Sequence, residues 1–166
     1  LDAQSMKSVI ACSILVLALA LPGCGFRLKG QYYLPDSLKT LYVSSAKKFS
    51  PLSKQVKLRL QQNQITLVKS AEKTVTELRL LPERFQRKTL SLFPNGQVAE
   101  YELVYQVQFQ VIKPGQVPLD FEFELSREFQ DDPNNALAKE RERQLILQEL
   151  RVSASDRILS QLKIIQ

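Results

Sequence analysis

Two long stretches of the chain alternate between apolar and polar positions. The apolar positions of the two stretches are Tyr101, Leu103, Tyr105, Val107, Phe109 and Val111, then Leu119, Phe121, Phe123 and Leu125. A period of two is typical of a β-strand with one buried face. Pro114-Gly115 separates the stretches and predicts a turn, so we expect an antiparallel pair of strands. Gln and Glu fill most positions between, which predicts a second sheet face that meets water or a polar partner.

Three further apolar segments predict additional strands. They are residues 40–44, residues 65–68, and a segment from about 75 to 93 that bends near Pro82. Their β-branched and aromatic residues favour extended structure. Asn95-Gly96 follows the third segment, and this dipeptide is a strong short-range sign of a hairpin.

Two segments have the period of a helix. Ser50-Pro51 provides an N-cap and a first helical residue, and Leu52, Val56 and Leu60 then recur every four positions. A longer helix is predicted from Asp132-Pro133 to about Leu162, with an apolar stripe of Leu145, Val152 and Leu159 widened by Leu150, Ile158 and Leu162. We therefore predict an α+β fold: a two-layer sandwich with a mostly antiparallel four- to five-stranded sheet and two helices packed on one face.

The first residues have the pattern of an export signal. Met6-Lys7 precedes an uncharged apolar run over residues 8–21, which is shorter than the roughly 20 residues of a spanning helix. Leu21-Pro22-Gly23-Cys24 is similar to a bacterial lipobox, although Pro22 departs from it. We expect residues 1–23 to be a cleaved signal peptide, residues 24–37 a tether lipidated at Cys24, and residues 38–166 one domain. The alternative is an ordinary signal peptide with a coincidental cysteine.

Composition excludes most catalytic chemistry. The 166 residues contain no His and two Cys, of which Cys12 would leave with the signal and Cys24 would carry lipid. A Ser-His-Asp triad, a Cys-His pair and a His-based zinc site are therefore absent. Glu100 and Glu102 share a strand face, and we interpret them as solvated acids. We predict no enzyme, no catalytic residues, no metal and no cofactor.

Positive charge is concentrated in the first half of the chain. The formal net charge is +6, but residues 24–73 carry +8 and residues 74–166 carry −2. Arg84, Arg87 and Lys88 form a basic group beside the predicted bend. Either an anionic partner binds these regions or the lysines simply cover a solvated face. Nucleic acid is disfavoured, because an exported lipoprotein does not meet it.

Several short motifs share the order and spacing of a known family. They are Cys24-Gly25-Phe26-Arg27-Leu28, Pro51-Leu52-Ser53, Asn95-Gly96-Gln97-Val98-Ala99-Glu100-Tyr101, Asp132-Pro133 and Ala136-Leu137-Ala138-Lys139. Together they resemble the LPS-assembly lipoprotein LptE family, formerly rare lipoprotein B. The resemblance implies a lipoprotein anchored in the outer membrane and facing the periplasm. It would plug the LptD β-barrel, assist the assembly of that barrel, bind lipopolysaccharide and help move it to the outer leaflet.

The resemblance also assigns roles to residues. Phe93, Asn95 and Gly96 would contact the barrel, and Lys139 occupies a family position for lipopolysaccharide binding. A second basic position of the family falls at Pro94, which is a departure. The basic residues left to compensate for it are Arg84, Arg87, Lys88 and Arg127.

A different class of protein also fits the export signal. A stand-alone periplasmic carrier lipoprotein would bind lipid by itself, and it would need an apolar cavity between the sheet and the helices.

Overall fold

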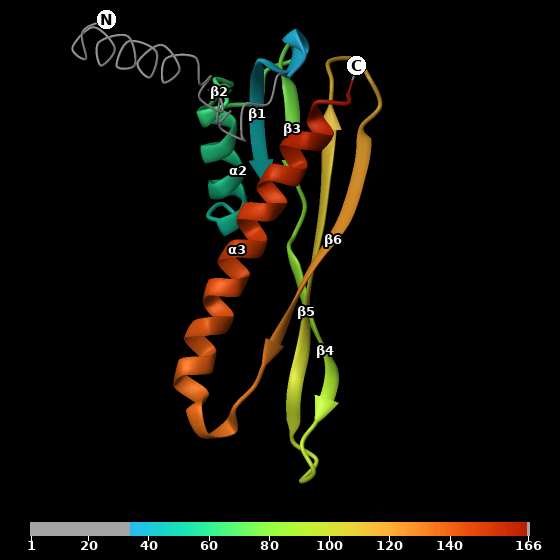
Figure 1. The fold of residues 1–166 in the computed structure, drawn as a ribbon. Coiled ribbons are helices and arrows are strands. Elements are labelled where there is room, and N and C mark those ends of the chain that lie inside the picture. The colour runs from blue at the N-terminus through green and yellow to red at the C-terminus, as the bar shows by residue number, and fades with distance from the viewer. Residues whose placement is uncertain (1–33, 166) are drawn as a thin grey trace, which may run out of the picture. The chain divides into compact units, whose positions relative to one another are not determined.

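The computed structural model describes residues 34–165 (Figure 1). The helices are α2 (Pro51–Gln62) and α3 (Ala136–Leu162), with short 3-10 helices at η1 (Asp36–Leu38) and η2 (Pro133–Asn135). The strands are β1 (Thr40–Ser45), β2 (Thr66–Val68), β3 (Thr76–Leu80), β4 (Arg84–Leu92), β5 (Val98–Ile112) and β6 (Leu119–Gln130). The predicted signal peptide, the lipobox with Cys24 and most of the tether lie outside the described residues, so those expectations stay predictions.

The six strands form one mixed sheet. β1 pairs in parallel with β2 and with β3. Between β1 and β2, helix α2 forms the crossover that a parallel pair needs. β3, β4 and β6 are antiparallel to β5. β6 pairs with β5 from Glu100 to Val111, so β3 and β4 share the other edge of β5, one after the other. The predicted α+β class is confirmed; the sheet has six strands because the chain leaves the ladder between β3 and β4, around Pro82.

Both helices pack against one face of the sheet (Figure 1). Tyr105 and Phe109 of β5 are fully buried in this layer and are among its largest side chains. They belong to one core cluster with Leu52, Val56 and Leu60 of α2 and with buried residues of α3. The predicted cap of α2 is present, because Ser50 Oγ accepts from Ser53 N at 3.3 Å. Asp132 accepts from Asn134 N at 3.0 Å but caps η2; the long helix α3 begins only at Ala136, after Asn135.

The predicted apolar stripe of α3 is wrong at its first position. Leu145 is 63% exposed, and the buried face instead begins at Leu147 and continues through Leu150, Ala154 and Ile158. A spacing of seven drifts around a straight helix because the helix has 3.6 residues per turn, so a strict heptad does not follow one face. Leu145 also precedes the part of α3 that faces the packed layer.

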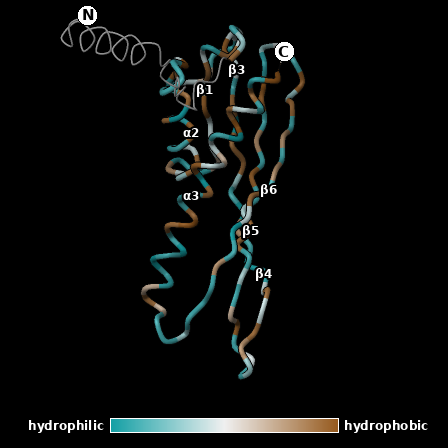
Figure 2. The backbone as a smooth tube through the Cα atoms, viewed as in Figure 1, coloured by the Kyte–Doolittle hydropathy of each residue, from teal (hydrophilic) through white to brown (hydrophobic). Residues whose placement is uncertain are grey.

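The domain consists of a packed body and a thinner extension. We use "the body" for residues 34–83, 105–125 and 147–165, which contain the whole hydrophobic core cluster. We use "the extension" for residues 84–104 and 126–146. Its buried hydrophobic side chains are Leu103, Val104 and Phe129, whereas every residue of β4 except Ser91 is exposed. The contrast follows the hydropathy of the chain, which is mostly polar along the first turns of α3 (Figure 2).

Candidate functional site

Cross-strand register divides the predicted basic residues between the two faces of the sheet. Arg87, Leu103 and Arg127 are neighbours across β4, β5 and β6, on the face that α3 covers. Arg84 is aligned with Gln106, and Lys88 with Glu102, both on the opposite face. Side chains directly opposite each other in a ladder share a face. The structure therefore separates Arg84 and Lys88 from Arg87 and Arg127.

Lys139 joins Arg87 on the helix-facing side. Arg87 Cζ lies 5.2 Å from the ring centroid of Tyr101, and Lys139 Nζ lies 5.4 Å from that of Phe129. Tyr101 and Phe129 are themselves cross-strand partners on β5 and β6. Each cation gains about 0.5–1 kcal/mol from such a ring at an exposed site. Residues from β4 and α3, far apart in sequence, thus form one cationic surface.

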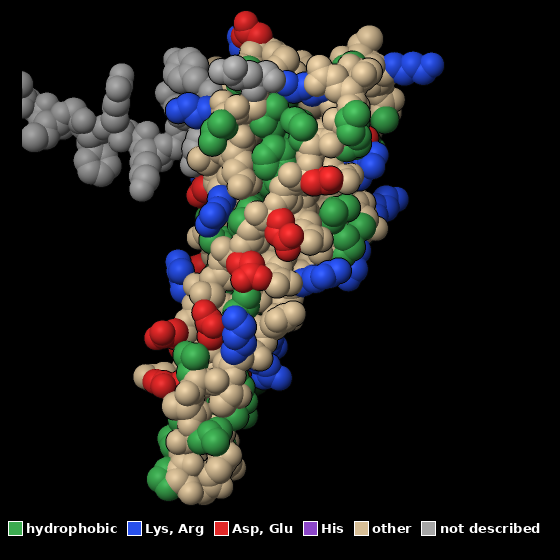
Figure 3. Space-filling view, turned by 90° about the vertical axis from the view of Figure 1, so that its right-hand side faces the viewer, with side chains coloured by type: hydrophobic (Ala, Val, Ile, Leu, Met, Phe, Trp, Pro, Cys, Tyr) green, Lys and Arg blue, Asp and Glu red, His purple; other side chains and the backbone are tan. Residues whose placement is uncertain are grey.

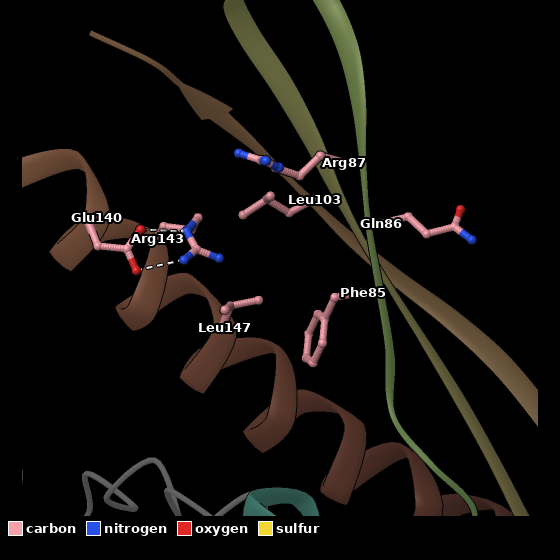
Figure 4. Close-up of a pocket in the computed structure, with 7 residues that line it drawn as sticks. All are labelled: Phe85, Gln86, Arg87, Leu103, Glu140, Arg143 and Leu147. Atoms are coloured by element: carbon pink, nitrogen blue, oxygen red, sulfur yellow. Dashed lines mark hydrogen bonds and ion pairs between the residues drawn. The ribbon is translucent and has the colours of Figure 1, made fainter. Parts of the chain in front are cut away.

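A cleft of about 260 Å³ opens between β4 and α3 on this side (Figure 4). We call it the sheet–helix cleft; its lining residues are Phe85, Gln86, Arg87, Leu103, Glu140, Arg143 and Leu147. In Figure 4 the side chain of Gln86 points away from the others, to the far side of β4. Arg87 and Arg143 extend toward the space between strand and helix, with Phe85 and Leu147 facing each other farther along.

Glu140 is the acid inside the cleft. It accepts two hydrogen bonds from Arg143, at 2.9 Å from Nε and 2.6 Å from Nη2, and one from Gln144 Nε2 at 2.8 Å. These hydrogen bonds, Arg143 first, and the charges of Arg143 and Arg87 hold the pKa of Glu140 below its ordinary value. The cleft thus contains two guanidinium groups and one ionised carboxylate, which leaves it net positive.

Sequence reasoning did not single out Arg143, because it stands in a run of mixed charges. Its position four residues after Lys139 was the available signal, since residues four apart lie on one helix face. Lys139 itself forms an ion pair with Glu142, with 2.9 Å between Nζ and Oε2, and its side chain is 22% exposed. The pair with Glu142 is the one expected of an ordinary helix charge, but the Lys139 side chain is mostly covered, with its ammonium over the Phe129 ring.

The predicted barrel contacts lie at the tip of the β4–β5 hairpin. Phe93 N donates to Gln97 O at 2.7 Å, and Gly96 adopts a φ of +83°, which glycine tolerates without strain. Phe93, Asn95 and Gly96 are all exposed, and Leu90 and Leu92 beside them are 49% and 59% exposed. In the view from the right-hand side of Figure 1, hydrophobic side chains reach the surface at this lower end (Figure 3).

A partly buried carboxylate lies in the body at its boundary with the extension. Glu83, in the bend before β4, accepts hydrogen bonds from Ser50 Oγ at 2.9 Å, from Tyr105 Oη at 3.0 Å and from Arg151 Nε at 2.9 Å. Burial alone would raise the pKa of Glu83, but the hydrogen bonds from Arg151 and Ser50 and the charge of Arg151 hold it below its ordinary value. Burial, followed by the charge of Glu83, raises the pKa of Tyr105. One side chain thus ties α2, β5 and α3 together.

Residues 34–165 contain neither a metal-binding cluster nor a membrane-spanning helix. No group of three or more acidic or thiol side chains there could hold a metal ion. None of the helices in this part is long and apolar enough to cross a membrane.

Comparison with known proteins places the chain in a family. The model of the family "LptE: Lipopolysaccharide-assembly" matches residues 38–162. The chain belongs to the LptE family. The LPS-assembly lipoprotein LptE of Yersinia pestis (strain Pestoides F) is 36% identical over 159 residues, which span 95% of this chain and 77% of that protein.

Solved structures agree with the LptE assignment. The crystal structure of rare lipoprotein B from Shewanella oneidensis superposes with a TM-score of 0.68 at 42% identity, covering 74% of this chain and 92% of that one. The solution structure of an uncharacterised lipoprotein B from Nitrosomonas europaea gives 0.66 at 25% identity, covering 84% and 90%. The resemblance predicted from the short motifs is confirmed.

Family membership gives the chain a coarse function. It is a membrane-associated lipoprotein with a role in lipopolysaccharide transport and assembly, and it is an accessory protein without enzymatic activity. The contact residues predicted above are a separate matter, because their positions in the fold do not by themselves say what they bind.

Proposed function

We propose that this LptE-family protein sits in the outer membrane as a lipid-anchored plug of the LptD β-barrel. It assists the assembly of the barrel, binds lipopolysaccharide and takes part in its transfer to the outer leaflet. The observation that carries the proposal is the family match over residues 38–162, which spans both the body and the extension.

The extension is the part that suits insertion into a partner. β4 is exposed along nearly its whole length, and Leu90, Leu92 and Phe93 leave apolar surface at its tip. Apolar side chains gathered at one place mark an interaction site more often than isolated ones do. We therefore assign the barrel contact to the hairpin tip, including Asn95 and Gly96 of its turn.

The helix-facing side of the extension is the better candidate for lipopolysaccharide. Arg87, Arg127 and Lys139 lie there, and a phosphate attracts an ammonium as a point charge and a guanidinium through two hydrogen bonds. Arg84 and Lys88, on the opposite face, would need a second and separate contact.

The filled layer between sheet and helices argues against a stand-alone lipid carrier. Tyr105 and Phe109 occupy that layer with no exposed surface, where a carrier would need space for acyl chains. Drug-sized ligands usually occupy pockets of about 300–1,000 Å³ that enclose most of their surface. The sheet–helix cleft is smaller and lies at the surface. Two larger hollows, of about 480 Å³ beside β1 and the β5–β6 turn and about 640 Å³ between α2 and β1–β2, are also open at the surface and do not enclose a ligand.

Co-purification from solubilised outer membranes tests the plug. The protein is expected to bring down LptD, identified by mass. Leu92→Ser combined with Phe93→Ser should reduce the recovery of LptD, whereas Val117→Ser, at an 82% exposed position in the β5–β6 turn, should not. A wild-type protein that is stable and free of partners in these membranes would contradict the proposal.

Lipidation is tested separately at Cys24. The proposed organisation is a cleaved signal peptide (1–23), a lipidated tether (24–37) and one domain (38–166). Cys24→Ala should remove the lipid mass and release the protein from the outer membrane. An unchanged intact mass would refute the anchor.

A further inference from the structure

We propose that the sheet–helix cleft is a subsite for a phosphate group next to an acyl chain, with Arg143 and Arg87 as ligands and Glu140 as a built-in competitor. The inference rests on the lipopolysaccharide binding proposed above. It adds where the ligand binds and which carboxylate competes with it. The shared ligand chemistry is a phosphorylated, acylated lipid, either a glycolipid such as lipopolysaccharide or an anionic phospholipid.

The cleft has a charged end and an apolar end, and a phosphorylated lipid likewise has a charged headgroup and apolar chains. Arg87, Arg143 and Glu140 lie toward one end, and Phe85 and Leu147 face each other toward the other (Figure 4). Leu103 lies between them and is buried. A headgroup phosphate would meet the arginines while the first methylenes of an acyl chain cover the apolar end, which removes apolar surface from water.

The apolar wall of the cleft is held in place from behind. The ring of Phe85 stacks on Tyr105 with 4.3 Å between centroids, and Arg151 Cζ lies 5.2 Å from the Phe85 ring. Tyr105 and Arg151 both bind Glu83, so the wall is fixed by the junction between body and extension. A ligand then meets a preformed surface, which lowers the entropy cost of binding.

The two arginines of the cleft differ in how many of their guanidinium donors already bind an acid of the protein. Arg87 makes a ring contact with Tyr101 but no ion pair among the residues that the structure describes. Arg143 donates two hydrogen bonds from its guanidinium group to the carboxylate of Glu140. A phosphomonoester carries more negative charge than a carboxylate and has three acceptor oxygens, so it can displace Glu140 from the Arg143 guanidinium. Glu140 then loses its partner and opposes binding. The phosphodiester of a phospholipid carries a single negative charge and competes less strongly.

Three variants in the cleft and one matched control test this arrangement. Arg143→Gln and Arg87→Gln should each weaken binding of lipopolysaccharide, by about tenfold if one charge-assisted hydrogen bond is lost. Arg143→Lys, which keeps the charge but loses the fork, should fall between wild type and Arg143→Gln. Glu140→Gln should tighten binding by about threefold or more, because it removes a negative charge beside the phosphate. The control is Arg84→Gln with Lys88→Gln, on the opposite face of the same strand, which should stay within about twofold.

The measurement uses the full lipidated chain in detergent and three probes. They are lipopolysaccharide, the same lipopolysaccharide after enzymatic dephosphorylation, and phosphatidylglycerol in mixed micelles. The phosphate model predicts that dephosphorylation weakens wild-type binding and removes the difference between Arg143→Gln and wild type. Unfolding midpoints of all variants confirm that each is folded.

The outcomes separate this inference from the function it rests on. If wild-type protein does not bind lipopolysaccharide, the proposed lipopolysaccharide binding fails. If the wild-type protein binds lipopolysaccharide and only the Arg84/Lys88 control variant binds it more weakly, the cleft assignment is overturned and the proposed function stands. Weaker binding by Glu140→Gln would show that the carboxylate positions Arg143, which overturns the competitor role. If wild-type protein binds phosphatidylglycerol as tightly as lipopolysaccharide, a preference for the glycolipid is overturned. The cleft is then a subsite that also accepts phospholipids.

Discussion

The body and the extension share the strand β5 but differ in what covers it. In the body, both helices cover β5, so Tyr105 and Phe109 have no exposed surface. From Phe109 on, β5 also lies between β3 and β6. In the extension its neighbour is β4, which is exposed, and only the first turns of α3 lie nearby. A strand becomes fully buried only where a second layer is present. The body thus provides stability, and the extension provides surface.

The largest effect should come from the centre of the body. Phe109 is fully buried and stacks on Phe121 with 4.9 Å between centroids. Phe109→Ala should lower the free energy of unfolding by about 4 kcal/mol, because it creates a cavity. Leu92→Ala, at an exposed extension site, should change it by less than about 0.5 kcal/mol. Urea unfolding measures both, and equal losses would show that the extension is packed as well as the body.

The junction should be nearly as sensitive. Glu83→Ala removes the shared acceptor of Ser50, Tyr105 and Arg151 and should cost about 3 kcal/mol, since it leaves a mostly buried guanidinium without its partner. Glu140→Ala, which breaks a more exposed pair with Arg143 in the extension, should cost under about 1 kcal/mol. Thermal or urea unfolding measures both variants. Similar losses of stability in Glu83→Ala and Glu140→Ala would mean that the contacts of Glu83 stabilise the fold no more than the exposed pair does.

The same carboxylate predicts how stability depends on pH. The pKa of Glu83 in the folded protein is below the ordinary glutamate value of 4.5, because Arg151 and Ser50 donate hydrogen bonds to its carboxylate. Its contribution is therefore complete above about pH 4.5 and is lost as the pH falls through the folded pKa. Glu83→Gln should make stability less dependent on pH in this acid range. An acid profile that is identical for wild type and Glu83→Gln would contradict this prediction.

Two turn glycines give a smaller and more local comparison. Gly96 in the extension and Gly115 in the β5–β6 turn both have positive φ, +83° and +69°, and no atom within 4 Å of an added Cβ. Alanine costs about 1–2 kcal/mol in such a conformation. We expect Gly115→Ala to lower global stability by about 1 kcal/mol, and Gly96→Ala mainly to speed amide hydrogen exchange in β4. A full global loss from Gly96→Ala would show that both regions unfold together.

The smallest effect should come from Lys139. Its pair with Glu142 spans three residues of one helix and its other contact is the Phe129 ring, so Lys139→Ala should change the free energy of unfolding by no more than about 1 kcal/mol. A variant of this kind can report on lipopolysaccharide binding without a change in folding. A large loss of stability would instead make Lys139 part of the structure of the extension.

Local patterns predicted the parts of the fold that depend on neighbours in sequence. The alternation of β5 and β6, the caps at Ser50 and Asp132, and the turn at Asn95-Gly96 are all present. The stripe through Leu145 failed because a helix position is buried only where another layer lies beneath it.

The candidate site depended on contacts that no sequence pattern contains. Arg84, Arg87 and Lys88 look like one group in the sequence, but the register of β4 places Arg87 on one face and the other two on the opposite face. Arg143 becomes a cleft residue only because α3 passes beside β4. Glu83 looks like an ordinary loop acid until Ser50, Tyr105 and Arg151 surround it.

The sequence by itself therefore determined the elements, the fold class, the family and the exclusion of catalytic chemistry. Those properties follow from residue periods, turn chemistry and the side-chain types that are present. Only the tertiary structure decided which cations share a face, which acid connects α2, β5 and α3, and where a cleft opens. These properties depend on strand register and helix packing, which bring together residues separated by dozens of positions, as Glu83 and Arg151 show.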